Sequence, residues 1–161
     1  MDFETTTTHC PICDADVEVP ADLFAGMAQM PKVIARAFRE PHATEGRKGW
    51  SPSEIVAHLA DVEVVEGWRI RQTLSEERPE LQPFDQGTWA EALDYKARDL
   101  ATSLAAYGAN RQLNLELLRR AGDAGMARVY RHAEFGEQPL SVFVTHIADH
   151  DLAHLRQIRG D

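Results

Sequence analysis

Four long stretches of the 161-residue chain repeat their apolar residues with the spacing of an α-helix. They cover about residues 21–39, 52–70, 88–120 and 141–159. Apolar residues at positions i, i+3, i+4 and i+7 give each stretch one hydrophobic face, and such faces are buried by packing helices together. Because no strong strand pattern competes with them, the sequence predicts an all-α fold, a four-helix bundle.

Two helix boundaries carry clear local signals. Ser51-Pro52-Ser53-Glu54 is a capping box with proline at the first helical position, so the second helix is expected to begin there. Gly160 is a suitable cap for the end of the last helix. Pro31 lies inside the first helix and is a candidate kink.

The segments between the helices are rich in proline, glycine and charge. Residues 75–87 are predicted to be a connector, and residues 122–140 an irregular segment or a small hairpin before the last helix. Residues 1–20 are predicted to be an N-terminal arm with a mobile run at Thr5–Thr8. The bundle domain is then expected to span residues 21–161.

The charge balance excludes some partners. Against 17 Lys and Arg the chain has 26 Asp and Glu, a net charge of -9, so its field repels nucleic-acid phosphates and anionic membrane surfaces. No apolar run approaches the ~20 residues that a membrane-spanning helix needs. The first residues lack the order of a secretory signal, so we expect a cytoplasmic protein with neither a nucleic acid nor a membrane as partner.

The seven histidines are unevenly distributed, and three of them lie close together in the last helix. His146, His150 and His154 are spaced four residues apart, which places them on one helix face. Side chains at this spacing have Cβ atoms about 5–6 Å apart, so two imidazoles can share one metal ion. Both His146 with His150 and His150 with His154 form such a pair.

A further ligand has to come from another helix, and His58 lies on the apolar stripe of the second helix. At about 1.5 Å per residue, His58 lies roughly 10 Å from the start of its helix, and His154 and His150 roughly 8 and 14 Å from the end of theirs. These depths coincide if the two helices are antiparallel. The long connector 75–87 permits that arrangement.

Three strings of residues resemble the DinB/YfiT-like superfamily. They are W-S-P-S-E-I-V-A-H-L-A-D at 50–61, the segment 84–90, and D-H-D-L-A-H-L-R-Q-I at 149–158. The resemblance implies an up-down-down-up four-helix bundle with a divalent metal bound by one histidine of the second helix and two of the last. By position, these ligands match His58, His150 and His154, leaving His146 as a neighbour.

Three neutral imidazoles suit Zn²⁺ or Ni²⁺ better than Ca²⁺ or Mg²⁺, and three protein ligands leave a position open. The superfamily that the sequence resembles includes metal-dependent hydrolases and transferases of low-molecular-weight thiols. We therefore predict an enzyme whose divalent metal activates a water or a small thiol. Asp61, one turn after His58, is the candidate catalytic general base, whereas Asp149 and Asp151 are predicted to lie on a solvated face.

The alternative is a non-catalytic helical bundle that binds a metal or a ligand. Under the enzymatic interpretation, the partner is a small-molecule substrate or a low-molecular-weight thiol, and the sequence does not identify it. The long, apolar third helix and the resemblance also favour a homodimer.

Cys10 and Cys13 are the two cysteines of the chain, in the string H-C-P-I-C. They form half of a zinc-ribbon ligand set, which His9 or a partner chain would have to complete. A redox dithiol and an incidental pair on the arm are the other interpretations.

Overall fold

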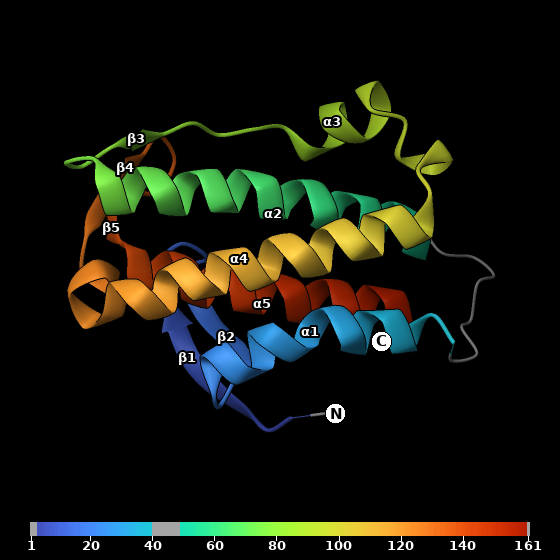
Figure 1. Ribbon diagram of the computed structural model, residues 1–161, viewed down its shortest axis with the longest axis horizontal. Coiled ribbons are helices and arrows are strands. Elements are labelled where there is room, and N and C mark those ends of the chain that lie inside the picture. Colours follow the sequence, from blue (N-terminus) through green and yellow to red (C-terminus); the bar gives the residue numbers. More distant parts are fainter. Residues whose placement is uncertain (1–2, 40–48, 161) are drawn as a thin grey trace.

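The computed structural model describes residues 3–39 and 49–160. In this part of the chain, the long helices are α1 (Leu23–Ala37), α2 (Pro52–Ser75), α4 (Leu100–Met126) and α5 (Leu140–Arg159). Figure 1 shows α1 and α5 running in one direction and α2 and α4 in the other. The predicted four-helix bundle is confirmed, with α2 antiparallel to α5.

The helix that carries His58 begins as predicted. Ser51 Oγ accepts a hydrogen bond from the Glu54 amide at 3.3 Å, and Glu54 Oε2 accepts one from the Ser51 amide at 2.8 Å, which completes the capping box. The helix that carries His150 and His154, α5, ends at Gly160. The φ of Gly160 is 83°, a left-handed conformation that favours glycine.

The prediction of one continuous third helix over about residues 88–120 is wrong. The chain forms α3 (Gln86–Ala92) and a 3₁₀ turn, η1 (Tyr95–Ala97), before α4 begins at Leu100. Asp94 has a left-handed φ of 48°, and the Asp99 carboxylate accepts a hydrogen bond from the Thr102 amide at 2.8 Å. The left-handed residue ends one helical stretch and the aspartate cap begins the next, so the apolar period continues across a break in the backbone.

Two small sheets correct the all-α prediction. β1 (Thr5–Cys10) and β2 (Ala15–Pro20) form an antiparallel hairpin, where the sequence predicted an arm. β4 (Val129–His132) and β5 (Gly136–Pro139) form the small hairpin predicted before the last helix. From the connector, β3 (Glu80–Leu81) adds a parallel strand beside β4.

The buried apolar residues form two clusters along the bundle. One includes Met30, Ile34 and Leu59, from α1 and α2, together with residues of α4 and α5. The other cluster extends into the β1–β2 hairpin, because β2 packs against α1 and α5. The hairpin residues in this cluster are Cys10, Val17 and Val19. The hairpin is therefore part of the hydrophobic core.

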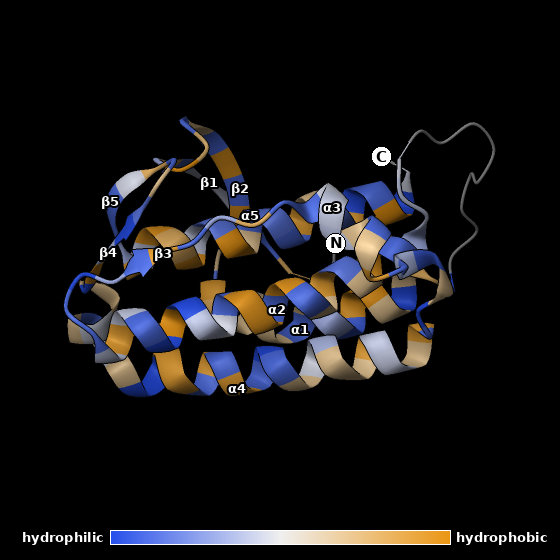
Figure 2. Cartoon of the chain, turned by 90° about the horizontal axis from the view of Figure 1, so that it is seen from above, coloured by the Kyte–Doolittle hydropathy of each residue, from blue (hydrophilic) through white to orange (hydrophobic). Residues whose placement is uncertain are grey.

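Along the helices, hydrophobic and hydrophilic residues alternate on the faces visible in Figure 2. Among the described residues, no helix is both long enough and apolar enough to cross a membrane.

Candidate metal centre

Three histidines from α2 and α5 converge on one point. His150 Nε2 lies 3.3 Å from His58 Nε2 and 3.1 Å from His154 Nε2. One ligand atom from each ring lies within 4.8 Å of those of the other two. The antiparallel arrangement of α2 and α5 thus brings together the three residues singled out in the sequence.

These distances agree with the geometry of a bound ion. With Zn–N bonds of about 2.0–2.1 Å, two ligands of a tetrahedral zinc ion lie about 3.3–3.4 Å apart. The two observed Nε2 separations fall within a few tenths of an ångström of that value. Two of the three pairs are therefore spaced as ligands of one divalent ion, and the ligand atoms of the third pair lie within 4.8 Å of each other.

Burial keeps the three imidazoles neutral, which leaves a nitrogen lone pair available on each ring. Desolvation, and then the repulsion that a protonated His154 would exert, lower the pKa of His58 to about 3. The pKa values of His150 and His154 are also lowered, mainly by burial. His58 is fully buried and His154 is 8% exposed, whereas His150 is partly exposed.

The Nδ1 atoms of His154 and His58, which do not take part in the Nε2 contacts, differ in their hydrogen-bond partners. His154 Nδ1 lies 2.7 Å from Gln157 Oε1, one turn further along α5. Because a carbonyl oxygen only accepts, Nδ1 donates the proton and Nε2 presents its lone pair to the centre. His58 Nδ1 is buried and has no hydrogen-bond partner among the described residues, and the Trp50 ring packs against it at 4.9 Å between centroids.

The partner of the Asp61 carboxylate is Arg98. Arg98 Nη1 donates to both carboxylate oxygens of Asp61, at 3.0 and 2.9 Å. The role of Asp61 as a catalytic base stays a prediction. The expectation for Asp151 is wrong, because this side chain is 1% exposed and lies inside the bundle, whereas Asp149 is partly exposed.

A buried polar network, which the sequence analysis missed, holds Asp151. Arg111 of α4 donates to Asp151 Oδ2 at 2.5 Å and to Glu63 Oε1 at 2.7 Å. Tyr107 and Asn114 add hydrogen bonds of 3.0 Å to Asp151 and Glu63. The available signal was the helical spacing of polar residues 107, 111 and 114 among buried leucines of the same helix. The network ties α2, α4 and α5 together beside the histidines.

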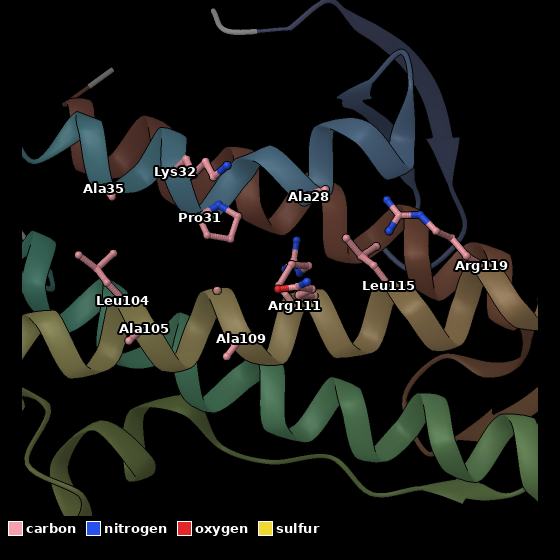
Figure 3. Close-up of a pocket in the computed structure, with 12 residues that line it drawn as sticks. Ala28, Pro31, Lys32, Ala35, Leu104, Ala105, Ala109, Arg111, Leu115 and Arg119 are labelled. Carbon is pink, nitrogen blue, oxygen red and sulfur yellow. The ribbon is translucent and has the colours of Figure 1, made fainter.

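A separate groove of about 740 Å³ lies between α1 and α4. Figure 3 shows Pro31 and Lys32 on its α1 side and Leu104 and Leu115 on its α4 side, with Arg111 between them. None of its lining residues belongs to the histidine triad. The groove and the candidate metal centre are therefore different places on the molecule.

The fold and the triad define a helical bundle with a candidate mononuclear metal centre. The chain belongs to the DinB superfamily, whose family model matches residues 27–158. It is 27% identical over 150 residues to YfiT of Bacillus subtilis, provisionally named a metal-dependent hydrolase, a match that covers 90% of this chain and 83% of that protein.

Another relative, from Oceanobacillus iheyensis, carries the same provisional name and is 29% identical over 114 residues. That match covers 68% of this chain and 65% of the relative, so it spans just under two thirds of the relative's length. The solved structure of YfiT, described as having an unusual four-helix bundle topology, superposes with a TM-score of 0.76 at 24% identity. It covers 84% of this chain and 81% of YfiT, which shows that the two share a fold.

Proposed function

We propose that the protein is a divalent-metal-dependent enzyme of the hydrolase or thiol-transferase kind, with Zn²⁺ or Ni²⁺ bound by His58, His150 and His154. The observation that carries this proposal is the convergence of three neutral Nε2 atoms at separations of 3.1 and 3.3 Å. The provisional names of the relatives support a metal-dependent activity. Imidazole nitrogens favour these ions over Mg²⁺ and Ca²⁺.

A bound ion would supply Lewis acidity, which activates a water or a low-molecular-weight thiol for attack on a small substrate. The chain's residues prepare the site for it. Gln157 fixes the tautomer of His154, and Trp50 shields the buried ring of His58 from water. A substrate would approach from the side of His150, the partly exposed residue of the triad. Asp61 is the proposed general base, and Arg98 holds its side chain in place through an ion pair of 2.9 Å.

Metal analysis of the untagged protein tests the site. We expect His58→Ala to lower the bound divalent metal by one ion per chain relative to the wild type. The matched control is His9→Ala, because His9 is an exposed histidine of β1 paired with Asp16 and lies outside the triad. Unchanged metal content in His58→Ala would contradict the triad as the binding site.

Turnover decides between an enzyme and a metal-binding bundle. Ester, amide and thiol-plus-electrophile substrates are assayed with the wild type, with His58→Ala and with Asp61→Asn. We expect at least one substrate class to turn over, with the activity lost in His58→Ala and reduced by about 10²–10⁴-fold in Asp61→Asn. If the metal-loaded wild type turns over none of these substrate classes, the non-catalytic alternative is favoured.

A further inference from the structure

The hairpin turn that carries both cysteines lies against α5, one helical turn before the histidine triad. Cys10 ends β1, Cys13 lies in the turn before β2, and both cysteines are free thiols. Cys13 Sγ lies 3.3 Å from His146 Nδ1. Together, the two sulfurs and one nitrogen of His146 lie within 4.8 Å of one another. The structure thus gathers a second set of three side chains that can ligate a metal, although Cys13 and His146 are 133 positions apart in the sequence.

The distances suit a zinc ion with mixed sulfur and nitrogen ligands. From Zn–S bonds of about 2.3 Å and Zn–N bonds of about 2.0–2.1 Å, a tetrahedral ion places S and N about 3.5–3.6 Å apart and two sulfurs about 3.8 Å apart. The Cys13–His146 separation needs only a few tenths of an ångström of adjustment. Two thiolates with an imidazole are a soft ligand set, which selects Zn²⁺ over Mg²⁺ or Ca²⁺.

The placement disfavours the other interpretations of the cysteine pair. A redox dithiol of this spacing is activated at the N-terminus of a helix, whereas Cys10 ends a strand and Cys13 lies in the turn that follows it. Completion by His9 is also disfavoured, because its ring faces Asp16 at 3.5 Å on the exposed side of the hairpin. The residue that faces the cysteines is His146, which the sequence analysis had placed beside the triad.

The site lies at the edge of the core, with one closed side and one open side. Cys10 is fully buried in the apolar cluster of the hairpin, whereas Cys13 is exposed and His146 is partly exposed. Three protein ligands leave one position of a tetrahedral zinc ion open, and on the exposed side of the site water can fill it.

We propose that Cys10, Cys13 and His146 form a second metal site, a zinc site that fastens the β1–β2 hairpin to α5. On binding, the two thiols release their protons to solvent and the thiolates coordinate the ion. The ligands come from segments far apart in the sequence, so a bound ion stabilises the folded arrangement of hairpin and helix.

Cobalt substitution tests this site separately from the triad, because only sulfur ligands give a near-ultraviolet thiolate-to-Co²⁺ charge-transfer band. The untagged protein is stripped with a chelator under reducing conditions and titrated with Co²⁺. We expect the band to saturate at one equivalent of added Co²⁺ per chain in His58→Ala, and by two equivalents in the wild type, where the triad also takes up Co²⁺. The band should be lost in Cys13→Ser. In His146→Ala, the Co²⁺ affinity measured from the band should fall by at least about tenfold.

Two controls keep the result interpretable. His9→Ala is expected to keep the band, and circular dichroism of Cys13→Ser is expected to show an intact bundle, since this side chain is exposed. The proposal is overturned if the reduced wild type shows no sulfur band, or if the band survives in Cys13→Ser. Loss of the triad's ion in His58→Ala with the band retained separates this site from the proposed enzymatic centre.

Discussion

Arg111 is the residue on which the buried polar network depends. Its side chain is 3% exposed and lies between the carboxylates of Glu63 and Asp151, which are 2% and 1% exposed. Arg111→Met would leave two buried carboxylates without their cation, so we expect the free energy of unfolding to fall by about 3–5 kcal/mol. Urea denaturation measures this loss.

The control for that prediction is another arginine of α4. Arg120 pairs with Glu116 one turn away, but both side chains are mostly exposed. Arg120→Met is expected to change the free energy of unfolding by about 0.5 kcal/mol or less. Equal losses in Arg111→Met and Arg120→Met would show that burial does not set the contribution of the network.

Glu66 gives the protein a pH dependence of known sign. Burial, and then the charge of Glu63, raise its pKa well above 4.5, and its Oε2 has no hydrogen-bond partner in the described part of the chain. The folded state therefore holds a proton that the unfolded chain releases, so this contribution to stability is lost as pH rises toward the folded pKa. Glu66→Gln mimics the protonated carboxyl and removes the effect.

We expect the stability of Glu66→Gln relative to the wild type to increase with pH, by up to about 1.4 kcal/mol per pH unit between the unfolded and the folded pKa. Urea denaturation at a series of pH values measures the slope. Glu77→Gln, at an exposed glutamate just beyond α2, should run parallel to the wild type. A Glu66→Gln curve parallel to the wild type would mean that Glu66 is ionised in the folded protein.

At the scale of single elements, the capping box of α2 sets where the helix carrying His58 begins. Ser51→Ala removes the acceptor for the Glu54 amide, and we expect a loss of about 1 kcal/mol in urea denaturation. The pKa of Glu54 should rise, since the Ser51 hydroxyl is the main cause of its lowering. Ser75→Ala, at the exposed end of α2, should have little effect, and a comparable loss there would argue against the cap.

The elements that the sequence predicted are those with local signals. The helical period and the capping box depend on neighbours within a few residues, and so does the pairing of His150 with His154. The break before α4 depends on the left-handed Asp94, a conformation that aspartate tolerates and does not require. A sequence pattern that continues across a bend does not reveal it.

The residues that were missed gain their roles from tertiary contacts. Arg111 interrupts an apolar stripe, and only the packed bundle shows that two carboxylates face it. Likewise, Cys10 and Cys13 are half of a ligand set until the hairpin packs on α5 and meets His146. His58 was found because it lies on the apolar stripe of its helix, at a depth that matches His150 and His154 if the two helices are antiparallel.

At the scale of the whole molecule, the question is whether the β1–β2 hairpin unfolds with the bundle. Val19 is 5% exposed and belongs to the same apolar cluster as residues of α1, α2, α4 and α5. Val19→Ala removes two buried methyl groups, so we expect a loss of about 2 kcal/mol from the global free energy of unfolding. Thr7→Ala, at an exposed position of β1, should cost about 0.5 kcal/mol or less.

Hydrogen exchange shows whether that loss is shared. If hairpin and bundle are one cooperative unit, the most protected amides of β2 and of α5 exchange with the same free energy, and Val19→Ala lowers both equally. Protection lost in β2 alone would make residues 1–20 a separately unfolding arm, as the sequence predicted. The cooperative outcome also bears on the proposed zinc site, because an ion bound by Cys10, Cys13 and His146 would then stabilise the whole bundle through α5.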